Sequence, residues 1–155
     1  PGTSPRRTPE EILHALGIAF TVHEHAPVRT YAEGVELLPF PPGAMVKTLA
    51  AETGGELVLA ALRGGDRIHF GRLARQLGVG RATLNAVSPA ALEVELGFEV
   101  GAVSLLTDFP SARLVDAGVA ALGTVYTGSG RADRTLELAA ADLIAASDAT
   151  VVELV

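Results

Sequence analysis

The chain has 155 residues, of which 48% are hydrophobic and 19% charged, and its formal net charge is −6. This composition excludes a disordered protein and predicts one domain large enough to bury a core. No apolar run approaches the roughly 18 residues that span a membrane, and the absence of cysteine excludes disulfides, thiolate nucleophiles and cysteine-ligated zinc. We therefore expect a cytoplasmic protein, with no cofactor and no metal.

The N-terminal residues 1–7 hold proline, serine, threonine and two arginines without an apolar segment. They predict a disordered lead-in rather than a signal peptide, followed by a single domain over residues 8–155. Thr8 and Pro9 are typical of a helix start, and Gly17 of its end.

Further along, the turn Gly54-Gly55 predicts a hairpin of strands 45–52 and 56–62. Capping and periodicity predict helices at 31–38, 70–77, 88–96 and 140–146, and strands at 18–23, 113–116, 124–127, 135–138 and 150–154. These elements interleave without the spacing of about 30 residues that a doubly wound fold shows. An α/β (α+β) fold is therefore expected, with a mixed, twisted or barrel-like sheet and peripheral helices.

Lys47 is the single lysine of the chain, whereas the other eleven basic residues are arginines. It lies within an apolar strand, where an unpaired ammonium is costly to bury. Its compact head, with three donors, suits a polar pocket that uses the charge. A lysine whose head simply reaches water at a strand end explains the pattern equally well.

Positive charge gathers between residues 57 and 92, where five arginines accompany one acid, Asp66. Arg72 and Arg75 stand three apart on the predicted helix 70–77 and so share a face. This face is a candidate contact for a phosphate backbone, although ordinary variation in surface charge accounts for it as well. The acidic whole discourages DNA binding.

Other chemical motifs are weak by themselves. His23-x-His25 offers two imidazoles but no third zinc ligand, and Ser104 lacks the sequence context of a catalytic triad. Backbone amides at Gly101 and at Gly128-Ser129-Gly130 can hold a carbonyl or phosphate oxygen. Together with Lys47, these two glycine-rich loops predict a pocket for a charged or ester-bearing group.

The order of these motifs resembles that of the YbaK family, the editing domains associated with prolyl-tRNA synthetase. The matching segments are Val46-Lys47-Thr48-Leu49, Gly65-Asp66, Arg72-Leu73-Ala74, Leu77-Gly78, Gly101-Ala102-Val103-Ser104, Gly128-Ser129-Gly130, Leu136-Glu137-Leu138 and Asp142-Leu143. The likeness spans residues 8–155. It implies an α/β domain that hydrolyses mischarged aminoacyl-tRNA. The lysine matching Lys47 is the required residue, and the loop matching Gly101–Ser104 shapes its pocket.

The resemblance implies a trans-acting aminoacyl-tRNA deacylase acting on Cys-tRNA(Pro) or another small amino acid on tRNA(Pro). Lys-Thr at 47–48 and Gly-Ser-Gly at 128–130 are closer to the cysteinyl branch than to the alanyl one. Catalysis is assigned to Lys47, tRNA binding to Arg72 and Arg75, and substrate binding to Met45, Thr48, Gly101, Ala102, Val103, Ser104, Gly128, Ser129 and Gly130. Prolyl-tRNA synthetase or an elongation factor is the expected helper, because an acidic chain has limited affinity of its own for tRNA.

One residue departs from the family pattern. Leu105 stands where the family loop has proline. This difference supports an alternative in which the same scaffold is a non-catalytic module that binds a nucleotide or tRNA end, since a fold alone does not carry a function.

Overall fold

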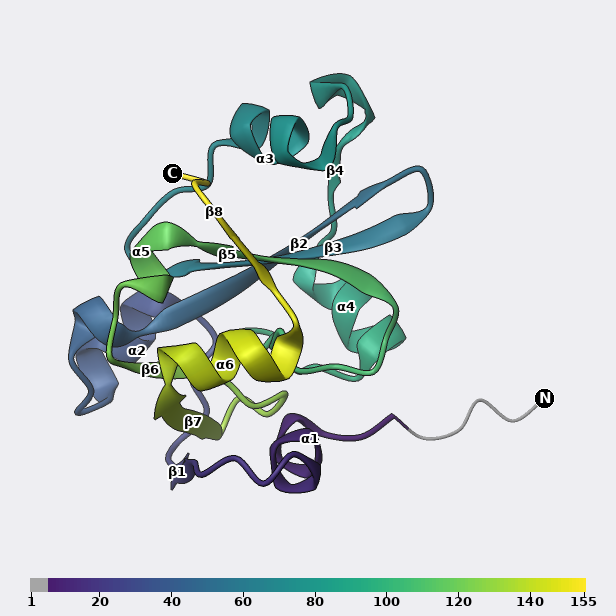
Figure 1. Cartoon of the computed structure of the whole chain (residues 1–155). Helices are drawn as coiled ribbons and strands as arrows, with labels where there is room; N and C mark the ends of the chain where they lie inside the picture. Colours follow the sequence, from purple (N-terminus) through teal and green to yellow (C-terminus); the bar gives the residue numbers. More distant parts are fainter. Residues whose placement is uncertain (1–5) are drawn as a thin grey trace.

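The computed structural model describes residues 6–155 (Figure 1). Residues 1–5 of the expected lead-in lie outside the described residues. The two arginines that follow contact the domain: the Arg6 guanidinium lies 4.5 Å from the centre of the Phe109 ring, and Arg7 Nη2 lies 2.8 Å from Asp108 Oδ1.

Helices and strands are interspersed along the described chain, with β2 and β3, and β6 and β7, following one another directly. The helices are α1 (Pro9–Ala15), α2 (Tyr31–Leu37), α3 (Phe70–Leu77), α4 (Pro89–Leu96), α5 (Ala117–Ala120) and α6 (Ala140–Ser147). The strands are β1 (Thr21–Glu24), β2 (Val46–Thr53), β3 (Glu56–Arg63), β4 (Asn85–Ala86), β5 (Ser111–Asp116), β6 (Thr124–Gly128), β7 (Arg134–Ala139) and β8 (Thr150–Val152). Short 3-10 helices occupy Pro42–Ala44 and Arg81–Thr83.

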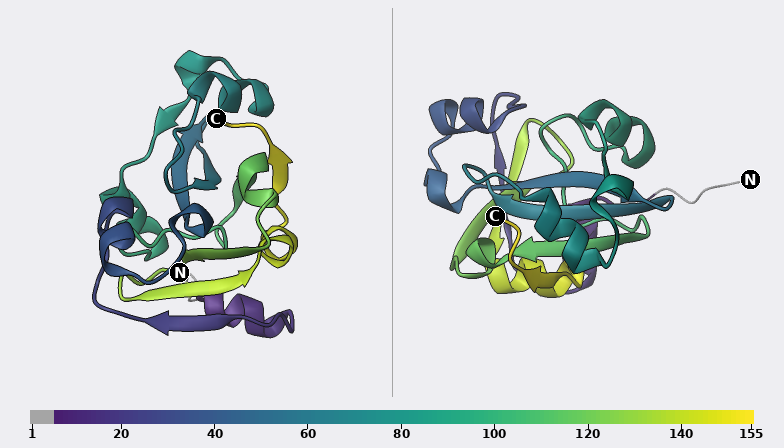
Figure 2. Two further views of the ribbon diagram at one scale, coloured as in Figure 1. Left: turned by 90° about the vertical axis from the view of Figure 1, so that its left-hand side faces the viewer. Right: turned by 90° about the horizontal axis from the view of Figure 1, so that it is seen from above.

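The strands form two sheets, with the helices around them (Figures 1 and 2). A five-stranded sheet has the order β4-β2-β3-β5-β8, in which β5 runs parallel to both of its neighbours. An antiparallel sheet has the order β1-β7-β6. An isolated bridge between Met45 and Tyr126 joins the two sheets. The mixed α/β class is thus confirmed, but the expected single sheet is divided in two.

Local capping explains why the helices begin and end where they do. Thr8 and Thr30 each form a capping box, with Glu11 and Glu33, at the starts of α1 and α2. The Ser88 side chain accepts a hydrogen bond from Ala91 N at the start of α4. Helices α3 and α4 end at glycines with left-handed backbone angles, as the sequence predicts.

Several elements differ from the sequence-based expectation, among them the short strand β4, which was not expected, and β5, which begins at Ser111 rather than at residue 113. β1 begins at Thr21 rather than at residue 18, and the short helix α5 was not predicted. β8 ends at Val152, two residues early, because Asp116 Oδ1 accepts the backbone N–H of Leu154 at 2.8 Å. The same buried carboxylate accepts Gly118 N and so starts α5. One side chain therefore decides two boundaries, the start of α5 through a local cap and the end of β8 through a contact 38 residues along the chain, which sequence patterns do not reveal.

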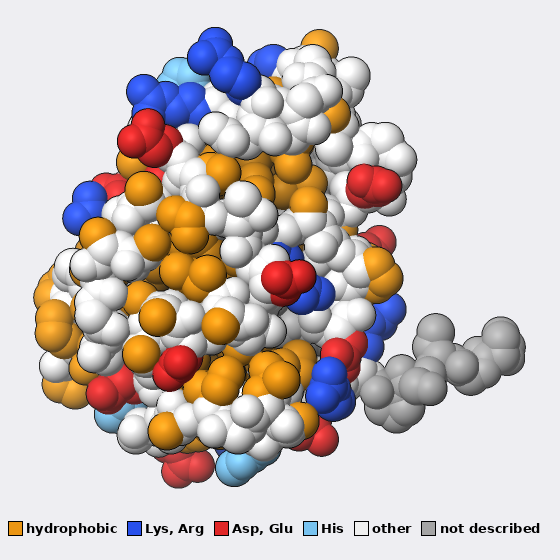
Figure 3. Space-filling model, viewed as in Figure 1, with side chains coloured by type: hydrophobic (Ala, Val, Ile, Leu, Met, Phe, Trp, Pro, Cys, Tyr) orange, Lys and Arg blue, Asp and Glu red, His pale blue; other side chains and the backbone are white. Residues whose placement is uncertain are grey.

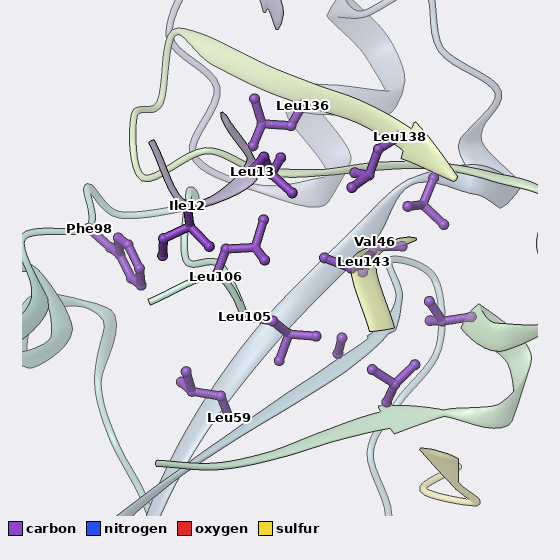
Figure 4. Packing of buried hydrophobic residues seen from close by; sticks show 14 of the residues in the cluster. Ile12, Leu13, Val46, Leu59, Phe98, Leu105, Leu106, Leu136, Leu138 and Leu143 are labelled. Carbon is purple, nitrogen blue, oxygen red and sulfur yellow. The ribbon is translucent and has the colours of Figure 1, made fainter. Parts of the chain in front are cut away.

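Strand β3 is buried on both faces because the five-stranded sheet carries a hydrophobic layer on each side. The larger cluster lies between the two sheets and includes Leu59 of β3, Leu136 of β7 and Leu143 of α6 (Figure 4). The smaller one lies under α3 and includes Leu62 and Leu73. Such close-packed layers hold β2 and β6 rigidly, and these two strands carry the site described next.

Candidate functional site

A cavity of about 360 Å³ opens beside strand β2, where the two sheets separate. Its walls come from β2, the end of β6, the loop 100–103, the start of α2 and the start of α4. β4 pairs with β2 only at Ala51 and Glu52, and the bridge to Tyr126 lies at Met45. Ala50 O also accepts Val87 N at 3.0 Å. The remaining edge of β2, residues 46–49, lies beside the cavity and pairs with no strand of the described chain on that side, which is where a ligand can approach the backbone.

Lys47 lines this cavity and is half-buried. Its ammonium donates a hydrogen bond to the backbone carbonyl of Asp66, with Nζ 2.5 Å from the oxygen. Burial lowers the pKa of Lys47, and the positive charge of Arg67 lowers it further, while the negative charge of Asp66 opposes both. An ammonium has three donors, so two remain for a group bound in the cavity.

The two glycine-rich loops lie against each other at one wall. Gly130 N donates to Ala102 O at 2.9 Å, and Glu99 N donates to Gly130 O at 2.9 Å. Gly101 has a φ of +86°, and a side chain there would lie 2.5 Å from the backbone of Arg29. Glycine adopts a positive φ without strain and has no β-carbon to meet Arg29, which is the physical reason for its presence.

The structure brings together seven of the residues that the sequence assigns to the site. Those lining the cavity are Met45, Lys47, Thr48, Gly101, Ala102, Val103 and Gly128. They come from three separate segments of the chain, 45–48, 101–103 and 128, so their convergence is a property of the fold.

Three residues expected to bind substrate do not line the cavity. Ser104 is fully buried, and its Oγ accepts Leu106 N at 3.1 Å. Ser129 Oγ donates to Arg134 O at 2.7 Å and thereby shapes the loop. A side chain at Gly130 would meet Phe98 on the far side of the loop. The serines are consumed by local hydrogen bonds, which explains why the sequence-based expectation and the structure differ here.

Arg72 and Arg75 lie outside the cavity on the exposed face of α3. The Arg72 guanidinium donates to the carbonyl of Val155. Phe70, at the start of the same helix, does line the cavity. Figure 3 shows basic side chains gathered at the end of the molecule that carries α3, so this patch adjoins the cavity.

Several lining residues were not expected from the sequence. Arg29, Arg131 and Arg134 add positive charge to the walls, and Thr127 of β6 adds a hydroxyl. Arg131 pairs with Glu99, with Nε 3.0 Å from Oε1. Arg131 and Arg134 follow the Gly-Ser-Gly turn closely, so the sequence could have indicated that they lie near the site. Nothing in the sequence indicated Thr127 except its position beside Gly128.

The two histidines of His23-x-His25 have separate partners. His23 Nε2 lies 2.7 Å from Glu137 Oε1, and His25 Nε2 lies 2.7 Å from Thr135 Oγ1. Within residues 6–155, no group of three or more histidine or acidic side chains is placed to hold a metal ion. Nor does any helix in this range have the length and apolar character to cross a membrane.

Comparison with solved structures supports the fold. Hypothetical protein APE2540 matches with a TM-score of 0.84 and 24% identity, over 94% of this chain and 97% of its own. A candidate trans-editing enzyme for prolyl tRNA synthetase matches with a TM-score of 0.81 and 22% identity, over 94% and 92%. Among curated proteins, none matches the sequence significantly.

The sequence also matches a family model. The model of the aminoacyl-tRNA editing domain covers residues 25–146, a range that contains every residue found in the cavity walls. The chain therefore belongs to the aminoacyl-tRNA editing domain family.

Proposed function

We propose that this editing domain acts in trans and hydrolyses the ester of tRNA(Pro) charged with cysteine or another small amino acid. The reaction class, aminoacyl-tRNA deacylation, follows from the family. The similar structure described as a candidate trans-editing enzyme for prolyl tRNA synthetase supports the choice of tRNA. A synthetase rejects a smaller amino acid poorly, because a missing methylene is worth only about 1–3 kcal/mol, so a second hydrolytic site is needed.

The observation that carries the proposal is the position of Lys47. The one lysine of the chain stands in the cavity wall, partly desolvated, beside the open edge of β2. An ammonium held there attracts the terminal phosphate and stabilises negative charge that develops on the acyl oxygen. Its bond to the Asp66 carbonyl fixes the head in place, so that little reorganisation is needed during the reaction.

The chemistry then requires few further groups. Water attacks the acyl carbon, the bond from that carbon to the ribose oxygen breaks, and the ribose oxygen takes up a proton while the amino acid leaves as a carboxylate. Lys47 acts as an anchor and electrostatic stabiliser in this scheme. The loop at Gly101 positions the ester, because close backbone approach confines it to the geometry of attack.

Recognition of the tRNA rests on the surrounding arginines. Arg29, Arg131 and Arg134 line the cavity, while Arg72 and Arg75 lie on the adjoining face of α3. Phosphate contacts of this kind supply most nonspecific affinity for nucleic acid. The net charge of −6 opposes binding of tRNA to the rest of the surface. We therefore also propose that prolyl-tRNA synthetase or an elongation factor helps to deliver the substrate in the cytoplasm.

The test is release of amino acid from tRNA(Pro) charged with cysteine, alanine, serine or proline, using wild type, Lys47→Ala and Lys47→Arg. We expect selective release by wild type, loss of at least a hundredfold in Lys47→Ala, and partial activity in Lys47→Arg, which keeps the charge. Circular dichroism confirms that each variant is folded. No release of any amino acid by folded wild type, with synthetase added, would refute the proposal.

That negative result would favour a binding module without catalysis. The sequence feature behind this alternative, Leu105, is fully buried in the core between the sheets (Figure 4). It does not line the cavity. The departure from proline therefore changes a packing position, and it gives the non-catalytic alternative no support at the site itself.

A further inference from the structure

Two buried hydroxyls in the cavity wall have no hydrogen-bond partner among residues 6–155. They belong to Thr48 of β2 and Thr127 of β6, whose exposed fractions are 8% and 2%. Both residues line the cavity. Another buried threonine, Thr107, accepts a hydrogen bond from Phe109 N at 3.1 Å. Because an unpaired buried hydroxyl is costly, the two in the cavity call for a partner that the protein does not supply.

Both hydroxyls occur on strand faces that are otherwise apolar. Val46 and Ala50 flank Thr48 on its face of β2, and both belong to the core between the sheets. Thr127 lies opposite the fully buried Leu136 in the neighbouring strand, and Val125 shares its face. Valine has nearly the same shape as threonine and would satisfy the packing at either position. Packing alone therefore does not explain the hydroxyls.

Their placement relative to Lys47 indicates what they contact. Consecutive residues of a strand point to opposite faces, so Lys47 and Thr48 face different ways. Lys47 reaches the Asp66 carbonyl and the charged exterior, whereas Thr48 faces the core. An ester bound with its phosphate end near Lys47 then directs its acyl side chain inward, toward Thr48 and Thr127.

Resting on the proposed function, we infer that Thr48 and Thr127 form a specificity floor that hydrogen-bonds a hydroxyl or thiol on a short acyl side chain. Buried core residues surround the floor, Val46 and Ala50 beside Thr48 and Val125 and Leu136 beside Thr127. A prolyl or alanyl group presents only carbon there and leaves both hydroxyls unpaired. A site built to hydrogen-bond a substrate group discriminates strongly against an analogue that lacks it. The same two residues would thus favour the mischarged ester and spare the cognate prolyl one.

The test compares two acyl groups that differ by one hydroxyl. We measure kcat/KM for tRNA(Pro) charged with serine and with alanine in wild type, Thr48→Val, Thr127→Val and the double variant. Wild type is expected to favour serine by about tenfold or more, and each valine is expected to lower this ratio several-fold. Thr48→Ser and Thr127→Ser, which retain the hydroxyl, should keep the wild-type preference for serine over alanine.

Thr53→Val is the matched control. Thr53 ends the same strand outside the cavity, and its hydroxyl lies 3.3 Å from that of Thr83. This substitution should leave the ratio of serine to alanine unaltered. Urea unfolding provides a second readout: Thr48→Val and Thr127→Val should be as stable as wild type or more so, because an unpaired hydroxyl is removed while the shape is kept.

The outcomes separate this inference from the proposed function. Equal loss of both rates in the valine variants would show that the hydroxyls hold the attacking water, and would overturn the inference. An unchanged ratio, or a wild type that prefers alanine, would overturn it also while leaving deacylation intact. Failure of wild type to release any amino acid would instead refute the proposed function.

Discussion

Replacing Gly128 with alanine tests whether close contact between the two glycine-rich loops builds the site. A β-carbon at this position would lie 2.7 Å from Ala102 O and would also collide with Val103 O. All of these neighbours are backbone atoms, so they cannot rotate away as a side chain would. The φ of Gly128 is not positive, and the perturbation is therefore steric rather than conformational.

The expected cost follows from two contributions. Overpacking costs about 1–3 kcal/mol, and displacement of the loop endangers the hydrogen bond from Gly130 N to Ala102 O, worth about 0.5–1.5 kcal/mol. The sum is roughly 2–4 kcal/mol. A domain of this size loses about 2–4 °C in Tm per kcal/mol, so Gly128→Ala should melt roughly 4–16 °C lower and remain folded at 25 °C.

Activity should suffer more than stability. A displacement of about 1 Å in a positioning element can cost a hundredfold in rate, and we propose that the loop at Ala102 is such an element. Thermal unfolding and deacylation are measured together, with Gly43→Ala as control because no atom lies within 4 Å of a side chain there. A Gly128→Ala protein with the Tm and activity of wild type would refute the contact between the loops.

Three further predictions concern charge. Arg72→Glu combined with Arg75→Glu should weaken tRNA association and lower the slope of log affinity against log salt concentration by about two in magnitude. Arg75 should contribute more, because Arg72 already donates to Val155 O. An affinity equal to that of wild type at all salt concentrations would contradict this prediction. Activity should fall as the pH rises through the pKa of Lys47, which is below that of an ordinary lysine, and this limb should move to higher pH in Lys47→Arg. Because the pKa is lower in the folded state than in the unfolded state, protonated Lys47 destabilises the fold at neutral pH, and this cost fades as the pH rises between the two values. Urea unfolding should therefore find Lys47→Met no less stable than wild type at pH 7. Marked destabilisation of this variant would contradict the conclusion that protonated Lys47 lowers the free energy of unfolding.

Local signals predicted most of the secondary structure. The Gly54-Gly55 hairpin, α3 with Gly78 and α4 between Ser88 and Gly97 agree with the structure closely. In each case the information lies within a few residues, in a cap, a turn or a periodic face. Helix α5 was missed although its N-cap, Asp116, lies two residues from the Gly118 N–H that it accepts. The end of β8 was missed because it depends on a contact between Asp116 and Leu154, which are 38 residues apart.

The sequence by itself determined the class of fold and the family resemblance and singled out Lys47 as a candidate, because each follows from residue type, order and spacing. Only the tertiary structure decided which residues share the cavity. It placed Gly101, Gly128 and Lys47 together and engaged Ser104 and Ser129 in structural hydrogen bonds. It also brought Thr48 and Thr127, whose hydroxyls have no partner within residues 6–155, to the wall of one cavity. The physical reason is that burial and hydrogen-bond satisfaction are properties of long-range contacts, and a linear pattern does not contain them.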